Sequence, residues 1–174
     1  MLNSKIEAAA NVERGNDEKA IGAYAIIGDC RTAALVSDDG SIDWLCLPHF
    51  WGRSVFAALL DQTRGGRFRI RPASKFRSKR RYCGPTAGLE ATFEKSTGSA
   101  CVADEMPTVE GTGTLHPLRE VLRVVEGIEG DASRFFGARG RTMRALTRAS
   151  DRVARLDGRA TGRTSFSFFA PRRR

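Results

Sequence analysis

An aromatic cluster near the middle of the first half offers the clearest binding chemistry in this sequence. Trp44 and Trp51 are its two tryptophans, and Pro48, His49 and Phe50 stand between them. Flat aromatic faces suit the stacking of sugar rings. Trp44 fits the alternation of a strand and is best explained as a core residue. Trp51 lies in a glycine-containing segment and, with His49 and Phe50, is the candidate for the edge of a carbohydrate cleft.

The remaining polar residues give little support for catalysis. Asp29, Asp43 and Asp104 are candidates for paired carboxylates, but turn and strand-edge positions account for each of them. A nucleophilic Cys30 would need an oriented base beside it, and the two histidines of the chain belong to no recognisable constellation. We therefore expect no catalytic residue in this chain.

Cysteine spacing and the polar N-terminus bear on metals and on compartment. Cys30, Cys46, Cys83 and Cys101 lie 16, 37 and 18 residues apart, whereas zinc sites use close pairs. No apolar run forms a secretory signal or reaches the roughly 18–20 residues that span a bilayer. We expect a cytoplasmic protein with four reduced thiols, no metal, no cofactor and no membrane contact.

A basic segment at 67–81 carries eight Lys and Arg in fifteen residues. Such a cluster attracts phosphates, but Arg67, Arg69 and Arg71 alternate with apolar positions, which predicts one solvated face of a sheet. Residues 1–130 are neutral overall, with 17 basic and 17 acidic residues. We expect no specific nucleic-acid binding from this segment.

The last 44 residues differ sharply in composition from the rest. Residues 131–174 hold 12 Arg, no Lys and three Asp, which accounts for the whole net charge of +9. With three Leu, Val or Ile residues they bury too little apolar surface to offset the entropy of ordering, so we expect a disordered or irregular tail. Two alternatives stay open. The tail is a functional Arg-rich segment that binds nucleic acid or acidic surfaces, or it is out-of-frame translation of a GC-rich gene, which the absence of Lys favours.

Apolar alternation and turn signals predict a mainly β domain over 22–130, after a flexible lead-in at 1–21. About seven short strands and one short helix point to an antiparallel β-sandwich. The expected elements are a hairpin turning at 37–41, a helix at 54–60, a strand at 66–72, a hairpin over 89–107 and a strand over 118–130. The side chains expected on buried faces are Phe68, Ile70, Phe93, Val102, Leu122 and Val124.

Five of these segments together carry a longer pattern. They are IGDCRTAALVSDDGSIDWLCLPHF (27–50), SVFAALLD (54–61), RGGRFRIRP (64–72), LEATFE (89–94) and LHPLREVLRVVEGIEG (115–130). In this order they resemble the trehalase-like N-terminal domain of family 15 glycoside hydrolases, the bacterial trehalase and glucoamylase type. The resemblance covers about residues 22–130. It departs from the family at 51–53, where Asp-Ser-Pro would be closer to the pattern, at Glu105, and beyond Gly130.

The resemblance implies a function as well as a fold. In that family a β-sandwich precedes a helical barrel, and the barrel carries the two glutamates that hydrolyse the glycosidic bond. The implied chain is a truncated accessory domain that is inactive alone, with an α-glucoside substrate only in the full-length parent. Because the family sandwich is longer, we expect an unpaired strand near 118–128 and possible self-association through that open sheet edge.

Overall fold

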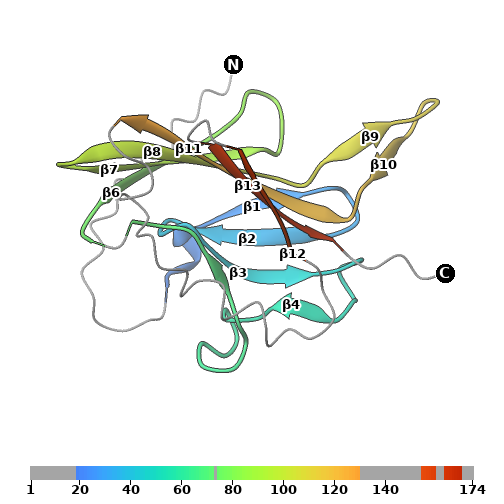
Figure 1. Cartoon of the computed structure of the whole chain (residues 1–174). Coiled ribbons are helices and arrows are strands. Elements are labelled where there is room, and N and C mark those ends of the chain that lie inside the picture. The colour runs from blue at the N-terminus through green and yellow to red at the C-terminus, as the bar shows by residue number, and fades with distance from the viewer. Residues whose placement is uncertain (1–18, 73, 130–153, 160–162, 170–174) are drawn as a thin grey trace, which may run out of the picture.

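The computed structural model describes residues 19–72, 74–129, 154–159 and 163–169. Two antiparallel sheets lie one over the other, and a two-stranded hairpin projects beyond them (Figure 1). The lead-in up to residue 18, residues 130–153 and the last five residues lie outside the described residues. The antiparallel β-sandwich predicted from the sequence is therefore confirmed, with more strands than the seven expected.

The five-stranded sheet follows a short 3-10 turn, η1 (Ile21–Ala23), and has the order β1-β2-β3-β4, with β5 paired to β3. Its strands are β1 (Tyr24–Gly28), β2 (Ala33–Ser37), β3 (Ser41–Cys46), β4 (Ser54–Phe56) and β5 (Phe68–Arg69). The predicted hairpin at 37–41 is confirmed as the β2–β3 connection. Gly40 has a φ of +77°, and a Cβ there would collide with the Ile70 carbonyl oxygen, so this turn requires glycine.

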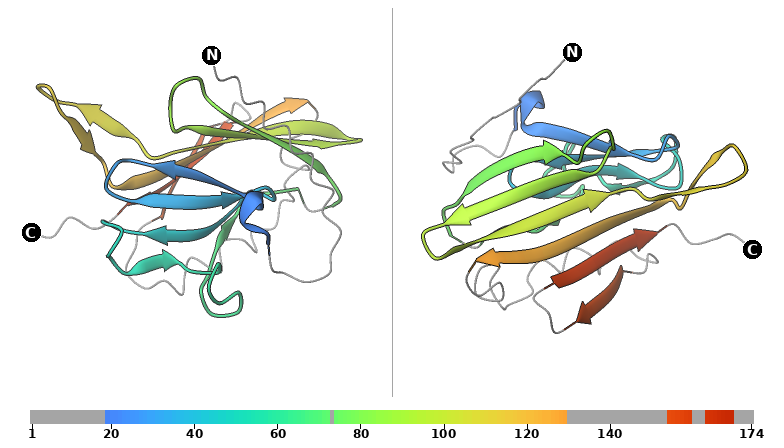
Figure 2. Two further views of the ribbon diagram at one scale, coloured as in Figure 1. Left: turned by 180° about the vertical axis from the view of Figure 1, so that it is seen from behind. Right: turned by 90° about the horizontal axis from the view of Figure 1, so that it is seen from above.

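The six-stranded sheet has the order β12-β13-β11-β8-β7-β6. Its strands are β6 (Arg77–Tyr82), β7 (Leu89–Lys95), β8 (Gly98–Glu105), β11 (Glu120–Glu129), β12 (Ala154–Arg159) and β13 (Arg163–Phe169). The predicted hairpin over 89–107 is confirmed as β7 and β8. A separate hairpin of β9 (Thr108–Glu110) and β10 (Leu115–Pro117) extends away from both sheets (Figures 1 and 2).

A single apolar core lies between the two sheets. Ile27, Val36 and Ile42 of the five-stranded sheet share it with Phe93 and Val102 of the six-stranded sheet, and each of the five is fully buried. Burying each such side chain contributes about 1.5–3 kcal/mol. The core therefore explains why the two sheets stack as layers.

Polar side chains of β6 bind the edge of the opposite sheet. The Tyr82 hydroxyl donates to the Ile26 carbonyl (3.0 Å) and accepts from the Ile26 amide (3.1 Å). The Arg80 guanidinium donates to the carbonyls of Ala23 (2.9 Å) and Val36 (3.0 Å). These bonds satisfy backbone groups of η1, β1 and β2 and close one side of the sandwich.

The helix expected at 54–60 is wrong. Ser54–Phe56 forms β4 and pairs with β3, and a single turn follows, in which the amides of Leu60 and Asp61 donate to the Ala57 carbonyl. Seven residues cannot sustain an isolated helix. The β-branched Val55 and the aromatic Phe56 gain more by filling the core as a strand.

The predicted inward face of β11 is also wrong. Val121, Arg123 and Val125 are buried, whereas the expected Leu122 and Val124 are half-buried on the other face. Alternation alone places a charged side chain outward. It fails here because Arg123 finds a buried carboxylate partner.

The edge strand expected near 118–128 is paired on both sides. β11 pairs with β8 over 122–129 and with β13 over 120–126. Residues 154–159 and 163–169 of the tail, which was expected to be irregular, form β12 and β13 and extend this sheet. The composition of the tail did not predict these strands, because a strand that pairs with an existing sheet edge gains backbone hydrogen bonds, which do not depend on residue type.

Candidate functional site at the loop end of the five-stranded sheet

Two turns lie together at one end of the five-stranded sheet. Because β1 to β4 are antiparallel neighbours, the β1–β2 turn (29–32) and the β3–β4 turn (47–53) fall at the same end. The Phe50 amide donates to the Arg31 carbonyl (3.3 Å). The Thr32 hydroxyl donates to the Cys46 carbonyl (2.6 Å). We call these two turns the loop end.

The predicted cleft-edge residues all lie in the second of these turns. The His49 and Trp51 rings stack with centroids 4.7 Å apart and planes 12° apart. Trp51 is 80% exposed and Phe50 is 59% exposed. The Gly52 amide donates to the His49 carbonyl (2.8 Å), and a Cβ at Gly52 would collide with that same oxygen. The turn is therefore tight, and it holds the indole out from the surface against the imidazole.

Trp44 lies elsewhere. It is half-buried on β3, in register with Leu35 of β2. The structure thus separates the two tryptophans that the sequence analysis considered together, and Trp51 alone belongs to the loop end.

Asp29 fixes the first turn. Its Oδ1 accepts from the amides of Arg31 (2.9 Å) and Thr32 (2.8 Å), which is the turn role expected from its sequence position. The residue is 2% exposed, and its Oδ2 has no hydrogen-bond partner. The Nδ1 of His49 is likewise buried without a partner.

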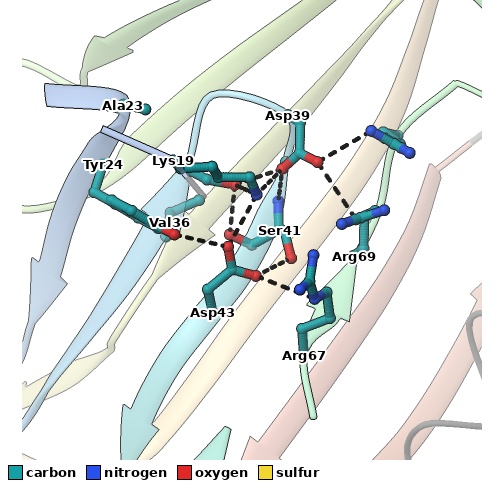
Figure 3. Close-up of polar contacts among 12 residues, drawn as sticks. Lys19, Ala23, Tyr24, Val36, Asp39, Ser41, Asp43, Arg67 and Arg69 are labelled. Carbon is teal, nitrogen blue, oxygen red and sulfur yellow. Dashed lines mark hydrogen bonds and ion pairs between the residues drawn. The ribbon is translucent and has the colours of Figure 1, made fainter. Parts of the chain in front are cut away.

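A second polar cluster lies at the opposite, β2–β3 end of this sheet (Figure 3). The Lys19 ammonium contacts Asp39 (2.8 Å) and Asp43 (2.9 Å), and both carboxylates are buried. The Tyr24 hydroxyl donates to Asp43 (3.0 Å), and the Ser41 hydroxyl also donates to it. We call this group the acidic cluster.

Arginines surround the acidic cluster from the segment after β4. Arg67 lies 3.7 Å from Asp43, and Arg69 and Arg71 lie 3.4 and 3.1 Å from Asp39. The prediction of a solvated face for these arginines is therefore wrong. They are partly buried because two carboxylates in the sheet require compensating charge.

The electrostatics of the acidic cluster oppose a role in proton transfer. Burial alone raises the pKa of Asp39, but Lys19, Ser37 and Arg69 outweigh it and lower that pKa to about 2. Burial likewise raises the pKa of Asp43, and the hydrogen bonds of Ser41 and Lys19 lower it below the ordinary value. Burial, followed by the Asp43 charge, raises the pKa of Tyr24 well above its ordinary range. Both carboxylates are therefore ionised and paired at neutral pH, which fits a structural role.

A buried ion pair lies within the six-stranded sheet, and its arginine also binds the five-stranded sheet. Arg123 of β11 is 0% exposed and binds Asp104 of β8 through two contacts, Nε–Oδ1 at 2.6 Å and Nη2–Oδ2 at 2.9 Å. The same guanidinium donates to the carbonyls of Phe68 (2.9 Å) and Gly40 (3.0 Å). Asp104 is thus paired with a residue on the neighbouring strand of its own sheet. Arg123 also fixes the β2–β3 turn through the Gly40 carbonyl.

Sequence reasoning missed Lys19, Asp39 and Arg123. The lead-in predicted at 1–21 includes Lys19, which lies two residues before the start of η1 and anchors the acidic cluster. Two features of the sequence were consistent with this cluster. The acidic run Asp38-Asp39 occupies a turn between two buried strands, and the arginines of 67–71 alternate with core residues.

Thiol and metal chemistry add no further site among the described residues. The four cysteines are free, with Cys30 exposed and Cys46 buried. Burial, then the Glu90 charge, raises the pKa of Cys101 to about 11. Within the described ranges no group of His, Cys, Asp or Glu is arranged to hold a metal ion. In the same ranges no helix is long and apolar enough to cross a membrane.

The fold and these clusters define a class: an antiparallel β-sandwich, cross-linked by buried charges, with an aromatic turn exposed at one end. Comparison with known proteins places it further. The chain belongs to the family described as trehalase-like, N-terminal, whose model matches residues 10–148. This range includes both sheets through β11 and extends into the segment after Gly130.

Several curated trehalases are similar to part of the chain. The trehalase of Mycolicibacterium smegmatis is 34% identical over 106 residues, covering 60% of this chain and 16% of the relative. Trehalase 1 of Sulfolobus acidocaldarius is 46% identical over 85 residues, covering 48% and 15%. The trehalase of Mycobacterium tuberculosis is 38% identical over 87 residues, covering 49% and 13%. The chain thus spans about a sixth or less of the length of these relatives, and no solved structure gives a significant match.

Proposed function

We propose that this chain serves as the accessory N-terminal domain of a trehalase- or glucoamylase-type enzyme of carbohydrate metabolism and has no turnover of its own. The observation that carries the proposal is the family match over residues 10–148. Relatives named trehalase, each several times longer than the matching segment, support it. The α-glucoside substrate then belongs to a longer parent protein in the cytoplasm.

The state of the buried carboxylates supports the absence of turnover. Inverting glycosidases need one protonated and one ionised carboxyl about 6.5–9.5 Å apart around a water. Asp39 and Asp43 are held ionised by Lys19, and Asp104 is paired with Arg123. A carboxylate whose charge is neutralised by fixed cations is a poor general acid or base.

We place the loop end at the border of the substrate cleft in the parent protein. Trp51, Phe50 and His49 expose aromatic surface that the sandwich itself does not cover. Neighbouring exposed aromatic groups favour a binding role, whereas apolar residues scattered singly on a surface are ordinary. The domain then contributes to substrate binding while another part of the parent performs the chemistry.

A domain exchange tests the accessory role. The segment of the Mycolicibacterium smegmatis trehalase that matches this chain is replaced by residues 19–129, and trehalose hydrolysis is compared with that of the parent and of a deletion lacking the segment. The exchanged enzyme should retain turnover that the deletion loses. A folded exchanged enzyme with no more activity than the deletion would contradict the proposal.

Self-association through an open sheet edge is a separate proposal. In the two larger sheets the described edge strands are β1, β4, β6 and β12, with the two-residue β5 beside β4 on β3. Tyr82 already binds the backbone of β1, and β6 carries Arg77, Lys79 and Arg81, charges that oppose edge pairing. The edges β4 and β12 are therefore the candidates. Sedimentation velocity over a range of concentrations tests it, and a monomer at all concentrations would refute it.

A further inference from the structure

We propose that the loop end is a subsite for one pyranose ring of an α-glucoside, with the ring stacked on the free face of Trp51 and its hydroxyls bound by Asp29 and His49. This inference rests on the proposed function of the same turn as a cleft border. It adds the polar partners and the size of the ligand, and it assigns binding to the isolated chain.

The geometry of Trp51 leaves one face of its ring available to a ligand. His49 stacks on one side of the indole at 4.7 Å and nearly parallel, which fixes the plane of the ring. At 80% exposure the opposite side remains open to solvent. The open face is therefore available for stacking, and one side of a pyranose chair carries apolar C–H groups that suit an aromatic face.

Two buried polar atoms of the loop end lack a hydrogen-bond partner. Buried polar groups in folded proteins almost always have a hydrogen-bond partner, so each exception calls for an explanation. Three buried side-chain atoms lack one in the part of the chain that the structure describes: Asp29 Oδ2, His49 Nδ1 and Arg69 Nε. Arg69 Nε lies 3.4 Å from the Asp39 carboxylate, which compensates its charge. The remaining two belong to the two turns of the loop end.

Asp29 Oδ2 and His49 Nδ1 restrict the chemistry of a ligand that could bind them. A carboxylate oxygen accepts hydrogen bonds, and an imidazole nitrogen donates or accepts according to its tautomer. A sugar hydroxyl does both, so hydroxyls of one ring have the chemistry that either atom requires. The Asp29 carboxylate disfavours anionic ligands such as phosphates. A neutral polyhydroxylated ring is therefore the class of ligand that satisfies the aromatic face and both polar atoms.

Reaching these atoms requires a small movement of the 47–53 turn, because both are covered in the unliganded chain. The turns are joined by the bond from the Phe50 amide to the Arg31 carbonyl, and at 3.3 Å this bond is long. Lifting the turn breaks this bond, and the sugar hydroxyls replace it. The Phe50 amide should therefore report binding together with the Trp51 indole.

The test is a titration of the full chain, labelled with ¹⁵N, with trehalose, maltose and the open-chain polyol mannitol. Both disaccharides should shift the Trp51 indole N–H and the Phe50 amide saturably, while the Trp44 indole and the mannitol titration show no change. Trp51→Ala should weaken binding at least about tenfold, and Trp51→Phe should largely restore it. Trp51 is exposed, so both variants should fold.

Asp29→Asn tests the polar partner, because the amide oxygen can still accept from the Arg31 and Thr32 amides while an NH₂ replaces the free oxygen. We expect binding at least about fivefold weaker. Ile26→Ala, an exposed apolar position on β1, is the matched control and should bind like the parent chain. Equal shifts with mannitol, no shift with either disaccharide, or full affinity in Asp29→Asn would overturn the inference. None of these outcomes affects the domain exchange, which tests the accessory role separately.

Discussion

Removing the carboxylate of Asp104 should destabilise the domain more than any change on its surface. Asp104 is 1% exposed and gives the buried Arg123 guanidinium both of its charged contacts, at 2.6 and 2.9 Å. Asp104→Ala leaves that cation buried and unpaired. Breaking one side of a buried pair costs about 3–5 kcal/mol. A domain of this size has about 5–15 kcal/mol in total, so we expect the variant to be largely unfolded or marginally stable.

The double variant Asp104→Leu with Arg123→Met separates the loss of charge pairing from the loss of packing. Replacing a buried pair by apolar residues is often neutral, but here the Phe68 and Gly40 carbonyls also lose their donor. Leaving buried carbonyls unpaired costs about 1–3 kcal/mol each. The double variant should therefore still lose about 2–6 kcal/mol in urea-induced unfolding at pH 7, from the two carbonyls rather than from an unpaired charge. A loss below about 1 kcal/mol in Asp104→Ala would refute the account of the ion pair.

Three further predictions concern the acidic cluster, the thiols and the tail. The pKa of Asp39 is lowered in the folded chain to about 2. Its contribution to the free energy of unfolding, on the order of 2 kcal/mol, is present above the unfolded pKa near 3.9 and is lost as the pH falls towards 2. Urea unfolding between pH 6 and 2 should show this loss in the parent and a flatter dependence in Asp39→Asn. Cys30 is exposed and should react with a maleimide-type reagent at pH 7 at least about tenfold faster than Cys101, whose pKa is raised to about 11. Mass spectrometry of partly labelled chain measures both rates, and equal rates would contradict the partial burial of Cys101. Any binding of the full chain to DNA or RNA should be weak and steeply salt-dependent, and it should disappear in a chain that ends at Gly130. Tight binding by that shorter chain at high salt would instead favour a basic interaction protein.

Much of the sandwich follows from local alternation. Phe68 and Phe93 alternate with polar residues and, like Val102, are buried as predicted. The errors arise where a distant partner decides the outcome. Arg123 is buried because Asp104, on the neighbouring strand, pairs with it, and alternation within 118–130 carries no information about that partner.

The candidate site follows the same division. The sequence predicted that Trp51 and Phe50 lie in a turn, because the glycine beside them interrupts the strand pattern, and the structure places both on the surface. It did not predict that the turn containing Asp29 meets this turn, because the hydrogen bond from the Phe50 amide to the Arg31 carbonyl depends on the antiparallel order of β1 to β4. The acidic cluster was missed for the same reason, since Lys19 and Asp43 meet through chain folding and not through spacing.

The measurement that tests the central claim most directly is glucose release by the purified full chain. Trehalose, maltose and soluble starch are incubated with the chain at high concentration between pH 4 and 8, with a heat-denatured sample as the blank. Because Asp39 and Asp43 are paired with Lys19, and Asp104 is paired with Arg123, the account predicts no glucose above the blank at any pH. Saturable turnover that a single substitution in this chain abolishes would contradict it.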